Sequence, residues 1–302
     1  MAQFELVETV TKDGLVHQGM FARPEPHSVP HSGTSRGRAL LWVHGLTGRF
    51  YGDVKTMNLF ADECTKQGMA FASFNTRGHD IISSMRKIDP KEPNGYTHVT
   101  IGASSEVFEE SVFDIDAGIS YLADQGFDQV ILAGHSTGAN KVCYYAGNTN
   151  DPRVAGVVLA GPMSDRLSEH TDKKQYDKNL TMLRELIETG RGDALLAKTH
   201  WFPITAKRAW SLLSPNTHED VFNYGDEKNV LVDFNKITSP VMVVLAGNDD
   251  VADRPAETIQ KVFDAHTGSK NYRSVIIPDA THQYSGKQQE FVHSVVSWAK
   301  SL

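Results

Sequence analysis

Apolar residues are arranged along this chain in short continuous runs, separated by longer segments in which they recur every three or four positions. A continuous run such as residues 39–43 or 129–133 is typical of a strand buried on both faces of a sheet. Further strands are predicted at 69–74, 154–160, 241–246 and 273–277, and helices at 51–67, 105–125, 137–146, 256–265 and 288–302. The repeated strand–helix units predict a parallel sheet with helices on both faces.

The N-terminal region follows a different pattern, because residues 4–10 and 15–23 alternate between apolar and polar and flank an Asp13-Gly14 pair. An Asp-Gly pair between two such runs predicts a β-hairpin. Residues 75–104 are polar and contain two prolines, so we predict a long loop there.

One stretch interrupts the strand–helix alternation. Residues 161–235 contain helical patterns, at 180–189 and 206–213, but no obvious strand. We therefore expect a single domain over residues 1–302, with a helical insertion at 163–232 that sits above the sheet as a cap or lid.

Charge and targeting signals narrow the class of protein. The chain has 30 Lys and Arg residues against 37 Asp and Glu, and its basic residues are scattered, which argues against a nucleic-acid partner. No run approaches the ~18–20 apolar residues of a membrane span, and the N-terminus lacks the pattern of a signal peptide. We expect a cytoplasmic protein in which Cys64 and Cys143 are reduced, buried thiols.

A candidate nucleophile follows the run at 129–133, where the sequence reads Gly134-His135-Ser136-Thr137-Gly138 and continues into a predicted helix. This is the G-x-S-x-G pattern in its strand–turn–helix context. The turn strains the backbone of the serine, and the flanking glycines remove side chains that would collide in it. The N-terminus of the helix offers N–H groups to an oxyanion. We therefore predict that Ser136 is a catalytic nucleophile.

A general base is expected after the last predicted strand, where Asp279-Ala280-Thr281-His282 lies before the final helix. Among 13 histidines, His282 is distinguished by this position, and an imidazole can accept and return the proton of the serine. We expect His135 to pack or hydrogen-bond locally, and His293 to face solvent.

The acid that orients His282 should follow the strand at 241–246, where Asp249 and Asp250 are adjacent. The spacing from Gly247 favours Asp250, whereas the apolar residues that follow the pair favour Asp249. We favour Asp249 and keep Asp250 as the alternative. Asp165 is a remoter candidate.

The loop after the strand at 39–43 reads His44-Gly45-Leu46-Thr47-Gly48, and a glycine-containing loop can bring a backbone N–H towards the nucleophile. The residue after the serine supplies the second donor of such a site. We therefore assign the oxyanion hole to the backbone amides of Leu46 and Thr137.

Together these residues resemble the α/β-hydrolase superfamily over nearly the whole chain. The likeness rests on 44–48, 75–79 (Asn-Thr-Arg-Gly-His), 134–138, the Asp249/Asp250 pair and His282. Within the superfamily the chain resembles the serine esterase and lipase-like branch that carries a helical cap between the sixth and seventh strands. The resemblance implies an α/β fold with a mostly parallel eight-stranded sheet, no metal and no organic cofactor. Serine at the elbow, rather than Asp or Cys, distinguishes the chain from the dehalogenase, epoxide-hydrolase and dienelactone-hydrolase branches.

The predicted function is hydrolysis of a small-molecule carboxylic ester through an acyl-enzyme. Aromatic residues either line an apolar pocket or pack the insert onto the core; they are Trp201, Phe202, Trp210, Phe222 and Tyr224 in the insert, and Phe50 and Tyr51 after the oxyanion loop. The same triad also serves thioester, lactone, amide or C–C hydrolases. A ligand-binding receptor with a slow triad is a further alternative, and a strained serine argues against a purely structural module. The sequence leaves open whether the chain acts alone or as a homodimer.

Overall fold

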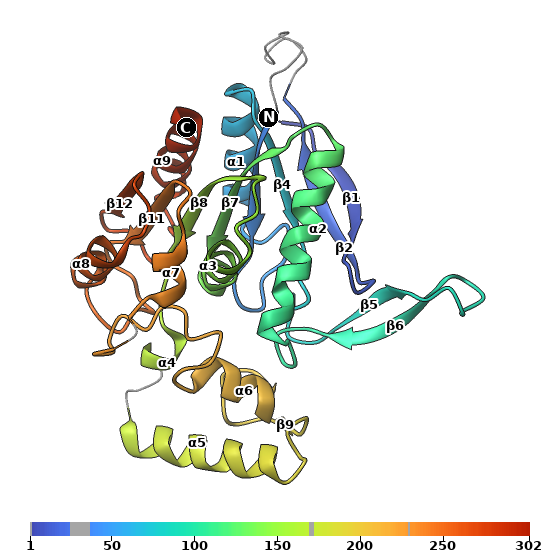
Figure 1. Cartoon of the computed structure of the whole chain (residues 1–302), viewed down its shortest axis with the longest axis vertical. Coiled ribbons are helices and arrows are strands. Elements are labelled where there is room, and N and C mark those ends of the chain that lie inside the picture. The colour runs from blue at the N-terminus through green and yellow to red at the C-terminus, as the bar shows by residue number, and fades with distance from the viewer. Residues whose placement is uncertain (1, 25–36, 169–171, 229) are drawn as a thin grey trace.

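The computed structural model describes residues 2–24, 37–168, 172–228 and 230–302. Its centre is an eight-stranded sheet in the order β1-β2-β4-β3-β7-β8-β11-β12 (Figure 1). The strands are β1 Glu5–Val10, β2 Val16–Ala22, β3 Arg38–Val43, β4 Ala70–Phe74, β7 Gln129–His135, β8 Val154–Ala160, β11 Val241–Ala246 and β12 Tyr272–Ile277. The pairings of β2 with β1 and with β4 are antiparallel and the other five are parallel, so the predicted mostly parallel sheet is confirmed.

The predicted N-terminal hairpin is present at one edge of the sheet. β1 and β2 pair antiparallel, and Gly14 in the turn between them has a positive φ of 92°. A side chain is strained at such an angle, which accounts for glycine there. β1 forms the edge of the sheet, and β2 joins it to β4.

Helices cover both faces of the sheet. Successive side chains of a strand point to opposite faces, and those of the central strands are buried on both. On one face, Leu40 and Trp42 of β3 pack with α1 (Val54–Lys66) and α9 (Gln288–Ser301). Leu41 and Val43 point to the other face, where they belong to the same apolar cluster as α2, α3 and α8. The three helices on that face are α2 Ser111–Asp124, α3 Thr137–Thr149 and α8 Ala256–His266. Cys64 and Cys143 are free and buried among these helices, as expected.

The prediction of a long loop at 75–104 is wrong in part, because this segment contains a second hairpin. β5 (Ser83–Ile88) and β6 (Tyr96–Ile101) pair antiparallel and project from the body of the molecule (Figure 1). Among their residues only Met85 is buried, so the apolar alternation that marks a half-buried strand is absent.

The chain between β8 and β11 forms the insertion, which lies at the opposite end of the molecule from the chain termini (Figure 1). Its helices are α4 Asp165–Ser168, α5 Lys173–Glu188 and α6 Ala206–Leu213, with α7 Val232–Lys236 leading back to the sheet. Contrary to the prediction, the insert also contains a two-stranded ribbon of β9 (Leu195–Leu196) and β10 (Ile204–Thr205). These strands are too short to carry a period-two pattern.

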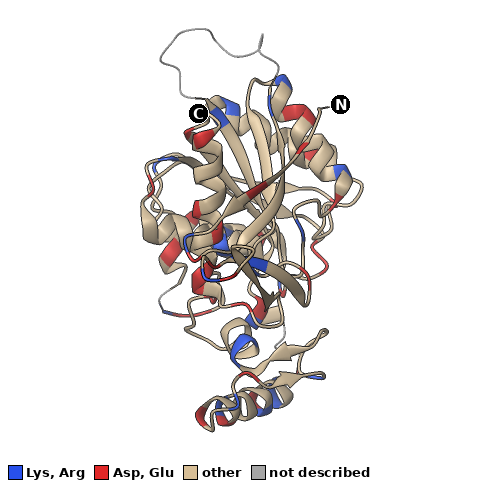
Figure 2. Ribbon diagram, turned by 90° about the vertical axis from the view of Figure 1, so that its right-hand side faces the viewer, with Lys and Arg blue, Asp and Glu red and all other residues tan. Residues whose placement is uncertain are grey.

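Tyr176 and Leu183 of α5 pack with Leu212 and Leu213 of α6 in a further apolar cluster, which also includes Ala103 after β6 and has Leu46 packed against it. The outer surface of the insert carries acidic and basic residues side by side (Figure 2). Within the described ranges, every helix is too short or too polar to cross a membrane.

Candidate active site

Ser136 lies at a sharp turn between β7 and α3 and has φ 56° and ψ −131°, a conformation that side chains rarely adopt. The turn brings the glycines on either side of it close to other backbone. A Cβ atom on Gly134 would overlap the Gly138 carbonyl, and one on Gly138 would overlap the Val43 carbonyl. The Ser136 N–H donates to the carbonyl of Ala160 at 3.0 Å, which holds the turn against β8.

The structure brings His282 and Asp249 together. Oδ2 of Asp249 lies 2.9 Å from Nδ1 of His282, while Oδ1 of Asp249 accepts the N–H groups of Val251 and Ala252. Asp250 instead accepts the backbone N–H of His282 at 2.9 Å. One carboxylate therefore contacts the imidazole and the other holds the backbone of the same residue. Asp165 begins α4 in the insert.

The surroundings of Asp249 favour its ionised form. Burial opposes the charge, but the hydrogen bonds from His282 and from the two backbone N–H groups outweigh burial and lower the pKa of Asp249 below its ordinary value. An ionised Asp249 fixes the proton of His282 on Nδ1 and leaves Nε2 as the basic nitrogen.

His135 connects the serine turn to His282. Its Nε2 donates to the His282 carbonyl at 2.8 Å, its ring centre lies 4.9 Å from that of His282, and its other side stacks on Trp42. Burial, with the nearby charge of His282, lowers the pKa of His135 to about 4, so the ring is neutral at pH 7. His135 both packs and hydrogen-bonds, but its partner is 147 positions away rather than local, and the bond joins the residue before Ser136 to the backbone of His282. His293 is on α9 and exposed, as expected, with Glu63 as a partner.

Gly161 makes room for the two histidine rings at the end of β8. It has a positive φ of 53°, and a Cβ atom there would lie 3.3 Å from Cε1 of His282 and 3.4 Å from Nε2 of His135. Sequence patterns did not single out this glycine, because it lies outside the motifs that suggested the site.

The loop after β3 runs directly against Ser136. A Cβ atom on Gly45 would lie only 2.9 Å from Cβ of Ser136, so a side chain there would displace the serine. Leu46 and Ser136 line the same cavity, and Thr137 is the buried first residue of α3. Both residues predicted to supply oxyanion donors therefore adjoin the serine, one in this loop and one next in the chain.

His44 fixes the orientation of that loop, a role that the sequence did not suggest. The backbone N–H of Thr76 donates to Nε2 of His44, so the ring proton is on Nδ1, which donates to the Gly45 carbonyl at 2.9 Å. Burial, aided by the charge of Lys141, lowers the pKa of His44 to about 3 and keeps it neutral. The Gly45 carbonyl and the Leu46 N–H belong to one planar peptide group, so holding the carbonyl also aims the N–H.

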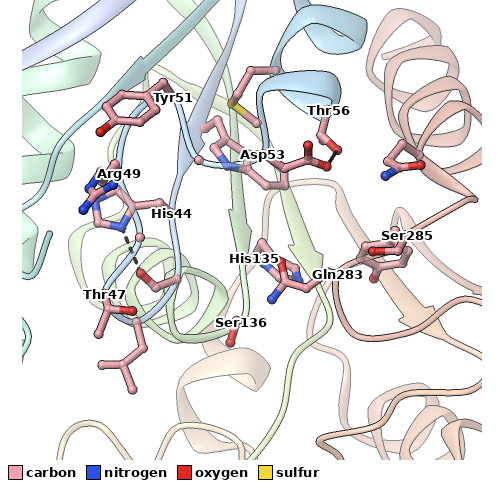
Figure 3. A pocket seen from close by; sticks show the side chains of 18 of the residues that line it. His44, Thr47, Arg49, Tyr51, Asp53, Thr56, His135, Ser136, Gln283 and Ser285 are labelled. Carbon is pink, nitrogen blue, oxygen red and sulfur yellow. Dashed lines mark hydrogen bonds between the residues drawn. The ribbon is translucent and has the colours of Figure 1, made fainter. Parts of the chain in front are cut away.

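A cavity of about 620 Å³ opens beside Ser136 (Figure 3). Its wall combines the loop at 44–48, the start of α1 and the segment before α9. The polar side chains on this wall include Arg49, Asp53, Thr56, Gln283, Ser285 and Gln288, and the apolar ones include Trp42, Tyr51, Met57 and Phe291.

Aromatic residues of the insert are absent from the wall of this cavity. Phe202, Phe222 and Tyr224 are buried in apolar clusters, and Trp201 is 67% exposed. Of the other aromatic candidates, Tyr51 lines the cavity, whereas Phe50 packs behind the loop against the ring of Tyr51. These positions favour packing over pocket lining for the buried aromatics of the insert.

Solved structures with a similar fold are esterases and other α/β hydrolases. An esterase from Pyrococcus furiosus is 15% identical, with a TM-score of 0.59 over 99% of this chain and 91% of that one. Est1E from Butyrivibrio proteoclasticus, bound to ferulic acid, is 15% identical with a TM-score of 0.61 over 97% of each chain. The α/β hydrolase GrgF from Penicillium sp. sh18 is 14% identical with a TM-score of 0.64, over 99% of this chain and 98% of that one. No curated protein sequence matches the chain.

The sheet order, the flanking helices and these likenesses define an α/β-hydrolase fold. The chain belongs to the family described as "Protein of unknown function (DUF1749)", whose profile matches residues 98–300. The matched part includes Ser136, Asp249 and His282, and the loop at 44–48, in which an oxyanion donor is predicted, precedes it.

Proposed function

We propose that the protein is a serine hydrolase that cleaves carboxylic esters through an acyl-enzyme. The hydrogen bond between Asp249 and His282, whose carbonyl accepts from His135 next to a serine held in a strained turn, is the observation that carries this proposal. Strained backbone persists where the surrounding structure enforces it, and a serine on a strained turn between a strand and a helix N-terminus is one arrangement that exposes a nucleophile next to oxyanion donors.

In the proposed reaction, Nε2 of His282 accepts the Ser136 hydroxyl proton as Oγ bonds to the ester carbonyl carbon. The backbone N–H groups of Leu46 and Thr137 donate to the resulting oxyanion. His282 then gives its proton to the alkoxide oxygen as the C–O bond breaks, and the alcohol leaves. Water, deprotonated by His282, attacks the acyl-enzyme, and as the bond between the acyl carbon and Oγ breaks, His282 returns the proton to Oγ, which releases the acid and restores Ser136.

The cavity beside Ser136 supports a compact substrate with hydrogen-bonding groups. Its volume suits a small molecule, and its wall offers amides, hydroxyls and charged groups as well as aromatic rings. A long alkyl chain would leave these polar groups without partners, which costs binding energy. The ferulic acid bound to Est1E is an aromatic acid with polar substituents, so it combines the two kinds of group that this wall would contact. We expect short or polar-substituted esters to be hydrolysed faster than long-chain ones.

The test is hydrolysis of p-nitrophenyl acetate, butyrate and decanoate by the wild type, Ser136→Ala and a control variant, Ser84→Ala. Ser84 is exposed on β5 in the projecting hairpin and is not among the residues that line the cavity. We expect Ser136→Ala to reduce kcat at least ~10³-fold, Ser84→Ala to match the wild type, and the short esters to be preferred. An unchanged rate in Ser136→Ala would refute the proposed nucleophile. Tight ligand binding without turnover would favour the receptor alternative.

A further inference from the structure

Four charged side chains are buried together where the insert meets the helix that follows Ser136. Lys141 comes from α3, Glu106 from the segment before the short 3₁₀ helix Phe108–Glu110, Arg208 from α6 and Glu219 from the chain after α6. Each is at most 5% exposed. The group contains two positive and two negative charges, so it is neutral as a whole. We refer to these four residues as the ion quartet.

Glu106 bridges the sheet domain and the insert. Its Oε1 lies 2.5 Å from Nζ of Lys141, and its Oε2 lies 3.3 Å from Nη2 of Arg208. Arg208 also binds Glu219 through both terminal nitrogens. Burial lowers the pKa of Arg208, but the charges of Glu219 and Glu106 outweigh burial and raise it above its ordinary value. Arg208 is therefore a permanent cation whose partners cannot be lost without leaving a buried charge.

The backbone at Gly78 passes close to the carboxyl group of Glu106. A Cβ atom on Gly78 would overlap the carboxyl group of Glu106, so only glycine leaves room for the bridge at that position. Gly78 belongs to the loop at 75–79 that follows β4, which the superfamily resemblance singled out without giving it a role. The loop thus packs against the ion quartet on one side.

On its other side, the loop at 75–79 contacts the loop at 44–48, which we refer to as the oxyanion loop. Nζ of Lys141 donates to Oγ1 of Thr76 at 3.4 Å, and the backbone N–H of Thr76 donates to Nε2 of His44 at 3.0 Å. His44 in turn holds the Gly45 carbonyl. Polar contacts therefore run without interruption from α6 in the insert to the peptide group that carries the Leu46 N–H.

Holding the insert on the sheet domain does not by itself explain why charged side chains are buried between them. Apolar side chains of similar size hold buried surfaces together at least as well as buried ion pairs, because charges lose their hydration when they are buried. Arg166 provides a comparison within the insert, since it is also buried and pairs with Asp220 and Asp226. The described contacts of Arg166 stay with these two partners and do not continue to the oxyanion loop.

We propose that Arg208, Glu106 and Lys141 are positioning residues through which the insert holds the oxyanion loop against Ser136. The catalytic part of this inference rests on the proposed hydrolase function. Without Arg208, the carboxylates of Glu106 and Glu219 compete for Lys141, which moves away from Thr76. His44 then loses the support behind it, and the Leu46 N–H is no longer aimed at the oxyanion.

The test compares Arg208→Met, Lys141→Met and the control Arg166→Met by two readouts. Hydrogen–deuterium exchange of the peptide spanning residues 44–50 reports on the oxyanion loop without any substrate. Steady-state kinetics on p-nitrophenyl acetate separate kcat from KM. We expect Arg208→Met and Lys141→Met to exchange ~10-fold faster at 44–50 and to lose ~10- to 100-fold in kcat with little change in KM, since aligned oxyanion donors act in the transition state. We expect Arg166→Met to change exchange only within the insert.

A charge-balanced double variant, Glu106→Gln with Lys141→Met, covers the case in which a single variant fails to fold. It removes one charge of each sign and leaves Arg208 paired with Glu219, and we expect it to loosen the 44–50 peptide as Lys141→Met does. If the 44–50 peptide of Arg208→Met and of the double variant exchanges at the wild-type rate, the proposal is overturned. Faster exchange at 44–50 in Arg208→Met and Lys141→Met than in the wild type, combined with a wild type that hydrolyses no ester, would leave the coupling standing and refute the hydrolase function.

Discussion

Asp249 and His282 are 33 positions apart in the chain, and their side chains meet at 2.9 Å beside the strained turn of Ser136. They come from the loops that follow β11 and β12, which pair in parallel and end at the same edge of the sheet. Asp250, next in the chain, accepts the backbone N–H of the same histidine. The two carboxylates therefore act on one residue in different ways, and substitution should separate them.

Replacing Asp249 with Asn should reduce kcat ~10³- to 10⁴-fold. An amide at this position lacks the charge that stabilises the imidazolium, and its NH₂ group can turn towards Nδ1 and impose the wrong tautomer on His282. Asp250→Asn is the matched control, because its amide oxygen can still accept the His282 N–H, and a loss of no more than ~10-fold is expected. Equal losses in the two variants, measured by ester hydrolysis, would contradict the assignment of Asp249.

The ambiguity between these aspartates shows where sequence patterns stop being informative. Both residues follow the same strand, and a pattern of apolar neighbours does not determine which carboxylate turns towards a histidine in another loop. The strands themselves were predictable, because a strand buried on both faces requires a continuous apolar run such as β11. The hairpin of β5 and β6 was missed because all of its side chains except Met85 are at least partly exposed and impose no such pattern.

The ion quartet was equally inaccessible to sequence reasoning. Lys141 occupies a helix in which most residues are buried, whereas a lysine in a helical pattern is ordinarily expected on the solvent-facing side. Its partner Glu106 lies far away in the sequence, and Glu106 in turn pairs with Arg208, which comes from the insert. Only the placement of the insert against α3 brings them together.

Substitution of Gly134 by Ala should destabilise the whole domain. The new Cβ would overlap the Gly138 carbonyl, and because both groups belong to the turn around Ser136, relief requires the turn to deform. A loss of about 3 kcal/mol in the free energy of unfolding is expected. Gly52→Ala is a suitable control, since the nearest atom to its Cβ is the Arg49 carbonyl oxygen at 3.3 Å. Urea unfolding of both variants gives the comparison, and equal stabilities would contradict the tight turn.

Mild acid should destabilise the protein through its buried neutral histidines. Burial lowers the pKa of His44 to about 3 and that of His135 to about 4, from an unfolded value of 6.5. As the pH falls below 6.5, the unfolded chain gains protons that the folded chain does not accept, so stability decreases until the folded pKa values are reached. Each histidine should reduce the free energy of unfolding by about 2 kcal/mol between pH 7 and pH 5.

The variant His135→Asn isolates one of these contributions. Its unfolding free energy should decrease less between pH 7 and pH 5 than that of the wild type, by about 2 kcal/mol, because one proton-accepting group is missing from the unfolded chain. Urea unfolding at the two pH values measures this difference. The same pH dependence in variant and wild type would mean that His135 does not remain neutral in the folded protein.

The central claim, that Ser136 is an activated nucleophile, is tested most directly by a fluorophosphonate probe and mapping of the adduct by mass spectrometry. The account predicts one stoichiometric adduct on Ser136 of the folded wild type, no adduct in Ser136→Ala, and labelling slowed at least ~10²-fold in His282→Ala, because the general base is missing. An unlabelled wild type, under conditions that label a known serine hydrolase, would contradict the claim, and so would an adduct at another residue.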